Sequence, residues 1–198
     1  MNISLAQAVQ KIEKGRVIAV PTDTVYGLAA SIRFPDSIQN IFDIKKRPFN
    51  KPLVIQIAAT TQLDSLVTDI PQIFHQLKSF WPGPLTMVFE ANIQNIPQKI
   101  RAGTNTVGIR IADCQLLREL ILQTGPLAIP SANVSDFPSA KTRKEVEGYF
   151  GKEFPVLDGG PCSLGKESTV VSLVGNELKI LRKGVITEEE LLKKHNPS

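Results

Sequence analysis

Histidine and cysteine are scarce in this chain, which has only two of each among its 198 residues. His75 falls within an expected helix and His195 in the C-terminal tail, so we expect neither a histidine-based catalytic triad nor a histidine-rich metal site. Cys114 and Cys162 lack CxxC spacing and therefore predict neither a zinc site nor a disulfide framework. Any chemistry must depend on lysine, arginine, hydroxyl and carboxylate side chains.

Long apolar runs are also absent, and none approaches the length that crosses a membrane. Residues 1–4 lack the start of a secretory signal, so we expect a cytoplasmic protein with no membrane segment. Hydrophobic residues make up 42% and charged residues 21% of the chain, which is typical of a globular protein and excludes a disordered one. The net charge of +4 suits phosphate-bearing partners but is too small to require nucleic acid.

Segments with helical and strand periodicity alternate along the first half of the chain, and strands dominate later. This order predicts one α/β domain with a mixed sheet. Capping pairs mark the start of three helices, with Ser4 and Gln7 as the clearest pair, and Asp36 is expected to cap another. Strands are expected at 16–20, 53–58, 85–90, 107–112, 127–129, 168–174 and 178–182, and helices at 5–14, 36–47, 62–80 with a break at Pro71, 114–123, 142–150 and 187–194.

Small polar residues follow the apolar strand at 127–129. Ser131, Asn133, Ser135 and Ser139 place hydroxyl and amide groups at the end of that strand, where α/β proteins bind ligands. Serine and asparagine are also ordinary turn residues. On this motif alone, a ligand site and a polar turn are equally good interpretations.

Four cations lie within seven residues at the end of the expected helix at 36–47. Lys45, Lys46, Arg47 and Lys51 could simply complement the helix C-terminus, an effect of about 0.3–1 kcal/mol at a surface. Two prolines stiffen the segment, however, and this lowers the entropy cost of binding an anion. The planar fork of arginine beside lysine charges favours a polyphosphate ligand.

Two further positions offer polar groups beside strands. Thr22, Asp23 and Thr24 follow the strand at 16–20, although such residues are common in turns. Thr106 and Arg110 share one face of the strand at 107–112, because side chains alternate along a strand. A buried arginine there is costly unless it meets an anion.

The segment 160–166 matches GxxxxGK, which is part of the P-loop pattern. Glu167 stands where a P-loop has serine or threonine, and a strand follows instead of the helix that would bind phosphate. We therefore reject a P-loop. The turn could bring Ser168 and Thr169 into a site, although a simple loop is equally consistent with the sequence.

Taken together, five segments resemble the YrdC/TsaC family in their order and spacing. The resemblance extends from about residue 4 to residue 184, and its most specific feature is the joint pattern KxR…SxN. It implies a YrdC-like fold, with a twisted mixed sheet flanked by helices and a large basic cavity, as a single domain over residues 1–198 that matches the short form of the family. The five segments are PTDTVYGL at 21–28, KKRP at 45–48, WPGPLT at 81–86, SAN at 131–133 and ESTVV at 167–171.

The activity that the resemblance implies is L-threonylcarbamoyladenylate synthesis, a nucleotidyltransferase reaction. L-threonine, bicarbonate and ATP would give threonylcarbamoyl-AMP and pyrophosphate, with Mg²⁺ accompanying the ATP and no resident metal. Partner proteins would then transfer the threonylcarbamoyl group to tRNA, and direct contact with tRNA or RNA is a further expectation.

The resemblance also assigns residues. It implies an L-threonine site at Thr24, Gln56, Arg110 and Ser168. It implies an ATP site at Lys45, Arg47, Lys51, Thr106, Ser131, Asn133, Ser139 and Arg182, with Lys45 and Arg47 as the catalytic cations. Departures from the family pattern occur at Gln56, where many members have histidine, at 112–114, at Lys166 and at Lys183.

Two alternatives remain open from the sequence. The basic site could belong to an RNA-binding module, although aromatic residues make up only 6% of the chain and do not interleave with the cations. The chain could also be a carbamoyl-transfer domain like the one in hydrogenase maturation proteins. The absence of attached domains and zinc-type cysteines disfavours that interpretation.

Overall fold

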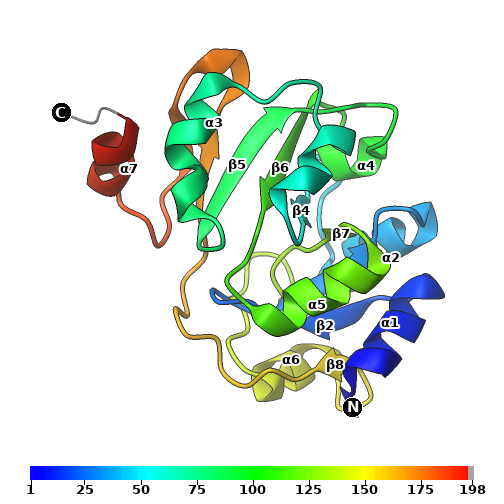
Figure 1. The fold of residues 1–198 in the computed structure, drawn as a ribbon. Coiled ribbons are helices and arrows are strands. Elements are labelled where there is room, and N and C mark those ends of the chain that lie inside the picture. The colour runs from blue at the N-terminus through cyan, green and yellow to red at the C-terminus, as the bar shows by residue number, and fades with distance from the viewer. Residues whose placement is uncertain (196–198) are drawn as a thin grey trace.

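A single mixed sheet runs through the computed structural model, which describes residues 1–195 (Figure 1). In the described residues the sheet has ten strands in the order β1-β8-β2-β3-β7-β4-β6-β5-β9-β10. Parallel and antiparallel pairs both occur, as the α/β prediction requires. The strands are β1 (Asn2–Ile3), β2 (Ile18–Val20), β3 (Gly27–Ser31), β4 (Val54–Gln56), β5 (Leu85–Glu90), β6 (Thr106–Arg110), β7 (Leu127–Ala128), β8 (Val156–Leu157), β9 (Thr169–Ser172) and β10 (Lys179–Arg182).

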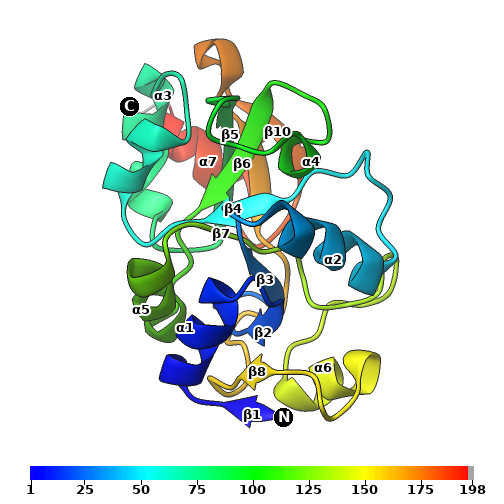
Figure 2. The same cartoon turned by 90° about the vertical axis from the view of Figure 1, so that its right-hand side faces the viewer.

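Helices cover both faces of this sheet. The helices α1 and α5 lie side by side, and α2 lies on the other side of β3 (Figures 1 and 2). Near the C-terminus, α7 packs beside α3. The helices are α1 (Leu5–Glu13), α2 (Pro35–Lys45), α3 (Gln72–Leu77), α4 (Gln98–Arg101), α5 (Gln115–Thr124), α6 (Arg143–Phe150) and α7 (Glu188–His195), with short 3₁₀ turns at η1 (Thr60–Ser65), η2 (Lys78–Phe80) and η3 (Val174–Asn176).

Helix starts follow the sequence signals in most places. The Ser4 hydroxyl accepts from the Gln7 amide while the Gln7 side chain accepts from the Ser4 amide, which confirms the predicted capping box. The prediction for Asp36 was wrong, because α2 begins at Pro35 and its N-cap is Phe34. Proline is favoured at the first helical position, where its missing N–H removes no hydrogen bond.

Three strands, β1, β3 and β8, and the helix α4 were not expected from the sequence, and one expected helix is broken up. The strand β3 is rich in alanine and glycine, which have low strand propensity, and it forms because β2 and β7 pair with its two edges. The single turn α4 lies within a segment without periodicity. Residues 62–80 form one short helix between two 3₁₀ turns, so the prediction of a helix with a single break at Pro71 was only partly right.

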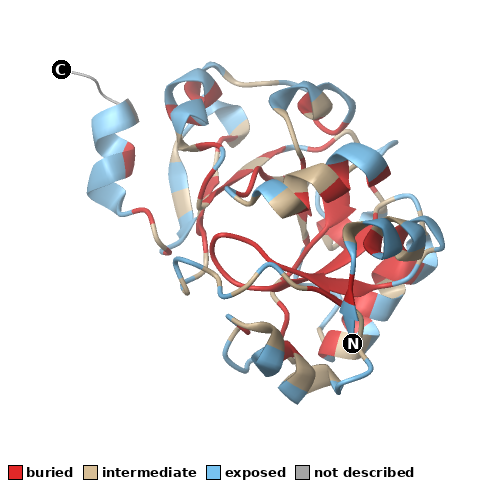
Figure 3. Cartoon of the chain, turned by 60° about the horizontal axis from the view of Figure 1, so that its bottom comes forward, coloured by how far each residue is buried: buried red, intermediate tan, exposed pale blue. Residues whose placement is uncertain are grey.

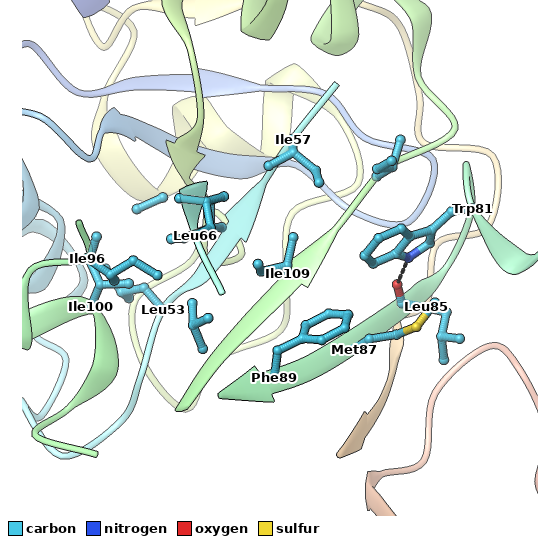
Figure 4. Close-up of a cluster of buried hydrophobic side chains, with 14 of the residues drawn as sticks. Leu53, Ile57, Leu66, Trp81, Leu85, Met87, Phe89, Ile96, Ile100 and Ile109 are labelled. Atoms are coloured by element: carbon cyan, nitrogen blue, oxygen red, sulfur yellow. Dashed lines mark hydrogen bonds between the residues drawn. The ribbon is translucent and has the colours of Figure 1, made fainter. Parts of the chain in front are cut away.

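Apolar side chains fill the space between the sheet and the helices, and the central strands are accordingly the most buried part of the fold (Figure 3). Trp81 packs there with Phe89 and Ile109, and its indole nitrogen donates to the Leu85 carbonyl at 2.6 Å (Figure 4). Full burial of each such side chain stabilises the fold by about 1.5–3 kcal/mol.

The alternation of side chains on β4 and β6 positions the site. Ile55 and Ile109 are register partners and lie in the core. Their neighbours Gln56 and Arg110 are also register partners, and they point to the opposite face because successive side chains alternate.

Candidate functional site

A pocket lies over the face that carries Gln56 and Arg110. It has a free volume of about 100 Å³. Its wall contains all four residues predicted for L-threonine, Thr24, Gln56, Arg110 and Ser168, and three of those predicted for ATP, Arg47, Ser131 and Arg182. The lining combines the three arginines Arg47, Arg110 and Arg182 with the carboxylate of Glu167. The large basic cavity expected from the sequence therefore remains a prediction.

Arg110 is the most deeply buried cation of the pocket, with 4% of its surface exposed. Its Nε donates to the Gly83 carbonyl at 2.9 Å, and Nη1 donates to the Thr24 hydroxyl at 2.8 Å. Nη2 forms an ion pair with the buried carboxylate of Asp23. Burial lowers the pKa of Arg110, and Asp23 opposes that effect. The anion that a buried arginine requires is therefore supplied by the chain itself.

Two buried oxygens beside Arg110 accept no hydrogen bond from the described residues. They are Asp23 Oδ2 and Gln56 Oε1. A buried acceptor without a partner costs about 1–3 kcal/mol, so native structures keep few of them. Because Gln56 lies on the pocket wall, a ligand with N–H or O–H donors would satisfy its oxygen.

Lys45, the last residue of α2, is fully buried and does not line the pocket. Its ammonium donates to the carbonyls of Ser131 at 2.5 Å and Asn133 at 2.8 Å, and to Asn133 Oδ1 at 3.0 Å. Burial, with a smaller contribution from the charge of Arg47, lowers the pKa of Lys45 to about 7. The pattern KxR…SxN is thus a direct contact in which the lysine holds the SxN backbone.

The asparagine of the SxN segment is also tied within the chain. Asn133 is buried, its Oδ1 accepts from the Ser131 hydroxyl at 2.7 Å, and its Nδ2 donates to the Phe137 carbonyl at 2.6 Å. Ser131 reaches the pocket wall and Asn133 does not. The asparagine therefore shapes the loop that presents the serine.

Arg47 is fixed within the cationic loop. Its Nε donates to the Lys51 carbonyl at 3.1 Å, and Nη2 donates to the Pro52 carbonyl at 2.8 Å. Burial lowers the pKa of Arg47. Lys51 is exposed outside the pocket and pairs with Asp136 at 3.1 Å. The loop therefore holds one of its cations against the pocket, as the stiffness of the segment suggested.

The structure also brings together residues that the sequence did not single out. Glu167 lies on the pocket wall, accepts from the Ser139 hydroxyl at 2.8 Å and pairs with Arg182 at 2.6 Å. The hydroxyls of Thr86 and Ser168 are 2.8 Å apart. Glu167 and Thr86 belong to the matching segments at 167–171 and 81–86, so the resemblance was the one signal that could have found them.

One predicted ATP residue is distant from the others. Thr106 is the first residue of β6, whereas Arg110 is the last, and a strand advances about 13 Å over four residues. The Thr106 hydroxyl is 3.1 Å from that of Thr104. The structure does not bring Thr106 to the pocket.

Metal-binding clusters and membrane-spanning helices are both absent from the described part of the chain. Residues 1–195 contain no group of three or more histidine, cysteine, aspartate or glutamate side chains that could hold a metal ion. Within the same residues, no helix combines the length and apolar character needed to cross a membrane. The segment 160–166 is a loop followed by β9, which confirms the rejection of a P-loop.

Comparison with known proteins places this architecture in a family. Residues 10–184 match the model of the Sua5/YciO/YrdC family, which carries the description "Telomere recombination". The chain belongs to this family. A relative from Bacillus subtilis (strain 168) is 38% identical over 190 residues, which are 94% of this chain and 55% of the relative. A relative from Pyrococcus abyssi is 40% identical over 185 residues, which are 92% of this chain and 54% of the relative.

Both of these Sua5/YciO/YrdC relatives are named threonylcarbamoyl-AMP synthase. The chain spans about half the length of these two relatives and of the Schizosaccharomyces pombe relative. The crystal structure of P. abyssi Sua5 complexed with L-threonine has a TM-score of 0.91 and 35% identity, covering all of this chain and 60% of that one. Escherichia coli YciO has a TM-score of 0.84 at 20% identity, and the match covers 96% of this chain and 97% of that one. This similarity shows the fold alone.

Proposed function

We propose that this chain is an L-threonylcarbamoyladenylate synthase. The observation that carries the proposal is the single pocket that gathers Thr24, Gln56, Arg110 and Ser168, the four residues predicted for L-threonine. The threonine complex of P. abyssi Sua5, a relative of the same fold, supports the same class of ligand. That residues 1–198 form one domain with a core at about 4–184 remains a prediction.

The proposed reaction has two steps. The ammonium group of L-threonine first loses a proton, and the resulting amine attacks the carbon of bicarbonate, which gives a carbamate and releases water. A carbamate oxygen then attacks the α-phosphorus of ATP, and the bond from that phosphorus to the β-phosphate oxygen breaks. The products are threonylcarbamoyl-AMP and pyrophosphate.

The pocket offers separate groups for the parts of threonine. Arg110 uses three of its five N–H groups on Gly83, Thr24 and Asp23, so two remain for a carboxylate. The unpartnered oxygen of Gln56 suits the amine or the hydroxyl, which are the donors of the substrate. The Ser168 hydroxyl on the same wall would complete the contacts.

Charge on the nucleotide would be met by arginines. Negative charge develops on the α-phosphate and the leaving pyrophosphate, and fixed cations stabilise it most effectively in such reactions. Arg47 and Arg182 line the pocket and would supply this charge, while Lys45 would act by holding the Ser131 loop in place. Lys51, Ser139 and Thr106 stay predicted nucleotide contacts.

Magnesium belongs to the substrate in this proposal. Mg²⁺ binds mainly through phosphate oxygens and water in ATP-dependent enzymes, with one or two protein carboxylates. A cytoplasmic location, tRNA as the eventual acceptor and partner proteins that transfer the threonylcarbamoyl group also remain parts of the proposal.

The decisive experiment is pyrophosphate release by the purified chain. With ATP and bicarbonate present, we expect release to require L-threonine and to accompany a product with the mass of threonylcarbamoyl-AMP. Replacement of Arg47 by alanine should abolish release while the protein stays folded, because a polar substitution near the surface usually changes stability little. Salt-sensitive tRNA binding without threonine-dependent release would instead favour the RNA-binding module.

A further inference from the structure

Thr86 lies between two residues of the proposed threonine site, although the sequence did not assign it to that site. It belongs to β5, which runs between β6 and β9 in the sheet (Figure 1). Met87 and Ile109 are register partners in the core, so Thr86 and Arg110 share the opposite face, which carries the pocket. On the other side of β5, the paired strand β9 begins directly after Ser168. Thr86 therefore separates Arg110 from Ser168 across the sheet.

The side chain of Thr86 is held in one orientation. None of its surface is exposed to solvent, so its hydroxyl acts on a ligand through a neighbouring group. Its methyl carbon Cγ2 lies toward Gly108, at 3.3 Å from the point where a Cβ would stand on that glycine. Its hydroxyl is 2.8 Å from the hydroxyl of Ser168. Contact of the methyl group with Gly108 thus directs the hydroxyl of Thr86 at Ser168.

Hydrogen-bond partners decide which of the two hydroxyls donates. Within residues 1–195, the Ser168 hydroxyl is the one hydrogen-bond partner of the Thr86 hydroxyl. If Ser168 donated, the hydroxyl hydrogen of Thr86 would be buried without an acceptor, which costs stability. Donation by Thr86 removes that cost, because the hydrogen of Ser168 can point into the pocket that Ser168 lines.

The acceptor positions of the Ser168 hydroxyl are then both filled. A serine hydroxyl has two acceptor positions and one hydrogen. Thr86 fills one position at 2.8 Å, and Arg182 Nη2 fills the other at 3.2 Å. What Ser168 offers a ligand is therefore its O–H donor. Such a donor suits a ligand oxygen and cannot accept from the ammonium group of an amino acid.

The carboxylate is the group of L-threonine that only accepts hydrogen bonds. Arg110 has two N–H groups free for it on one side of Thr86, and the Ser168 hydroxyl donates from the other side. We infer that Thr86 is a positioning residue that makes Ser168 a hydrogen-bond donor to the carboxylate of L-threonine. The inference rests on the proposed function, because that function supplies the ligand.

The test combines calorimetric binding of L-threonine to the full chain with the kinetics of threonine-dependent pyrophosphate release. Thr86→Val keeps the methyl group beside Gly108 and removes the hydroxyl, whereas Thr86→Ser keeps the hydroxyl. Thr124→Val is the matched control. Thr124 is also buried, and its hydroxyl donates to the Leu120 carbonyl at 3.0 Å, away from the pocket.

We expect T86V to raise both the Kd and the KM for L-threonine about fivefold, a factor typical of one hydrogen bond. The kcat should stay within about twofold of the parental value, because the carboxylate takes no part in bond formation. T86S should restore the parental Kd, and T124V should keep it. A parental Kd in T86V would overturn the inference, and so would a T86S variant that binds as weakly as T86V. A fall in kcat at an unchanged KM would also overturn it, since Ser168 would then act on a reacting group.

A double variant tests whether Thr86 acts through Ser168. S168A should weaken L-threonine binding at least as much as T86V does. T86V combined with S168A should bind L-threonine as S168A does, because Thr86 then has no hydroxyl to orient. A further loss in the double variant would overturn the inference, since Thr86 would then act by another route.

The parent chain separates this inference from the proposed function. If the folded parent neither binds L-threonine nor releases pyrophosphate with it, the proposed function fails and the inference fails with it. If the parent does both and T86V matches it, only the inference fails. Melting curves check the fold of each variant. Valine favours strands, so T86V should fold; if it does not, Thr86→Ala also removes the hydroxyl and carries the same expected Kd.

Discussion

The ammonium of Lys45 donates to the backbone carbonyl of Ser131 at 2.5 Å, although 86 residues separate them in the sequence. Asn133 provides two more acceptors, so three oxygens surround a cation that solvent does not reach. This contact joins the end of α2 to the loop after β7. It explains why lysine and serine occur together in the KxR…SxN pattern, because the ammonium of Lys45 orients the backbone of Ser131.

Replacement of Lys45 by methionine is the first prediction. The substitution keeps the length of the side chain but leaves the Asn133 carbonyl without a donor in the interior, and it leaves the Ser131 carbonyl with only the Asn133 amide at 3.2 Å. We expect the free energy of unfolding to fall by about 2–4 kcal/mol, measured by urea denaturation. The neighbouring substitution Lys46→Met is the control, since Lys46 is exposed. A variant K45M with parental stability but without nucleotide binding would show that Lys45 acts on phosphate instead.

The buried pair of Asp23 and Arg110 gives the second prediction. Asp23→Asn removes the only carboxylate that pairs with Arg110 in the described residues and leaves a buried guanidinium charge. We expect a loss of about 3–5 kcal/mol in the free energy of unfolding.

A double-mutant cycle tests whether the pair itself causes that loss. In D23N combined with Arg110→Met, no uncompensated charge remains, so the double variant should lose clearly less stability than the sum of the two single variants. Additive losses would mean that Asp23 and Arg110 act independently.

The sequence predicted the strands that carry the site better than it predicted their neighbours. The strand β5 begins and ends at the expected residues because its alternating apolar pattern has only one good register. The strand β3 was missed, since its glycine and alanines favour no strand locally and only the pairing of both its edges makes it one. Local patterns cannot report pairing between distant segments.

The same limit applies to the site. The sequence identified Arg110 as a buried arginine that needs an anion, and position 23 as a carboxylate beside a strand, but nothing local joins them. Lys45 was interpreted as a phosphate contact, whereas the fold uses its three donors on the backbone and side chain of the SxN segment. Charge and residue type predict which ligand a group could bind, and only the fold decides whether the group is already occupied.

Cys162 gives a prediction about pH. Burial raises the pKa of the Cys162 thiol to about 11, and burial also raises the pKa of Cys114. At pH 8 a thiol with a pKa of 11 is about 0.1% thiolate, against roughly a quarter for a free cysteine. We therefore expect Cys162 in the folded C114S variant to react with iodoacetamide about two hundred times more slowly than in urea.

The pH dependence of that reaction has a definite sign. The rate should rise about tenfold per pH unit from pH 8 to 10, whereas a free thiol levels off near its pKa of about 8.5. Because the folded state then binds more protons than the unfolded state, the free energy of unfolding should also fall as the pH rises through this range. A rate for Cys162 that levels off below pH 9 would contradict the raised pKa that we attribute to partial burial of its thiol.

The last prediction concerns Gln56, where one substitution should weaken L-threonine binding without lowering the stability of the fold. Its Oε1 is buried without a hydrogen bond from residues 1–195, and the residue lies on the pocket wall as a register partner of Arg110. An apolar side chain of similar size would remove an unsatisfied acceptor, so Gln56→Leu should leave the free energy of unfolding unchanged or raise it by about 1 kcal/mol. The same variant should raise the KM for L-threonine about tenfold or more, because the substrate loses an acceptor that the pocket keeps at a cost in stability.

Urea denaturation and threonine-dependent pyrophosphate release measure the two effects, with Gln94→Leu as the control at an exposed position. A stability loss above about 1 kcal/mol together with an unchanged KM would make Gln56 part of the scaffold and remove it from the threonine site.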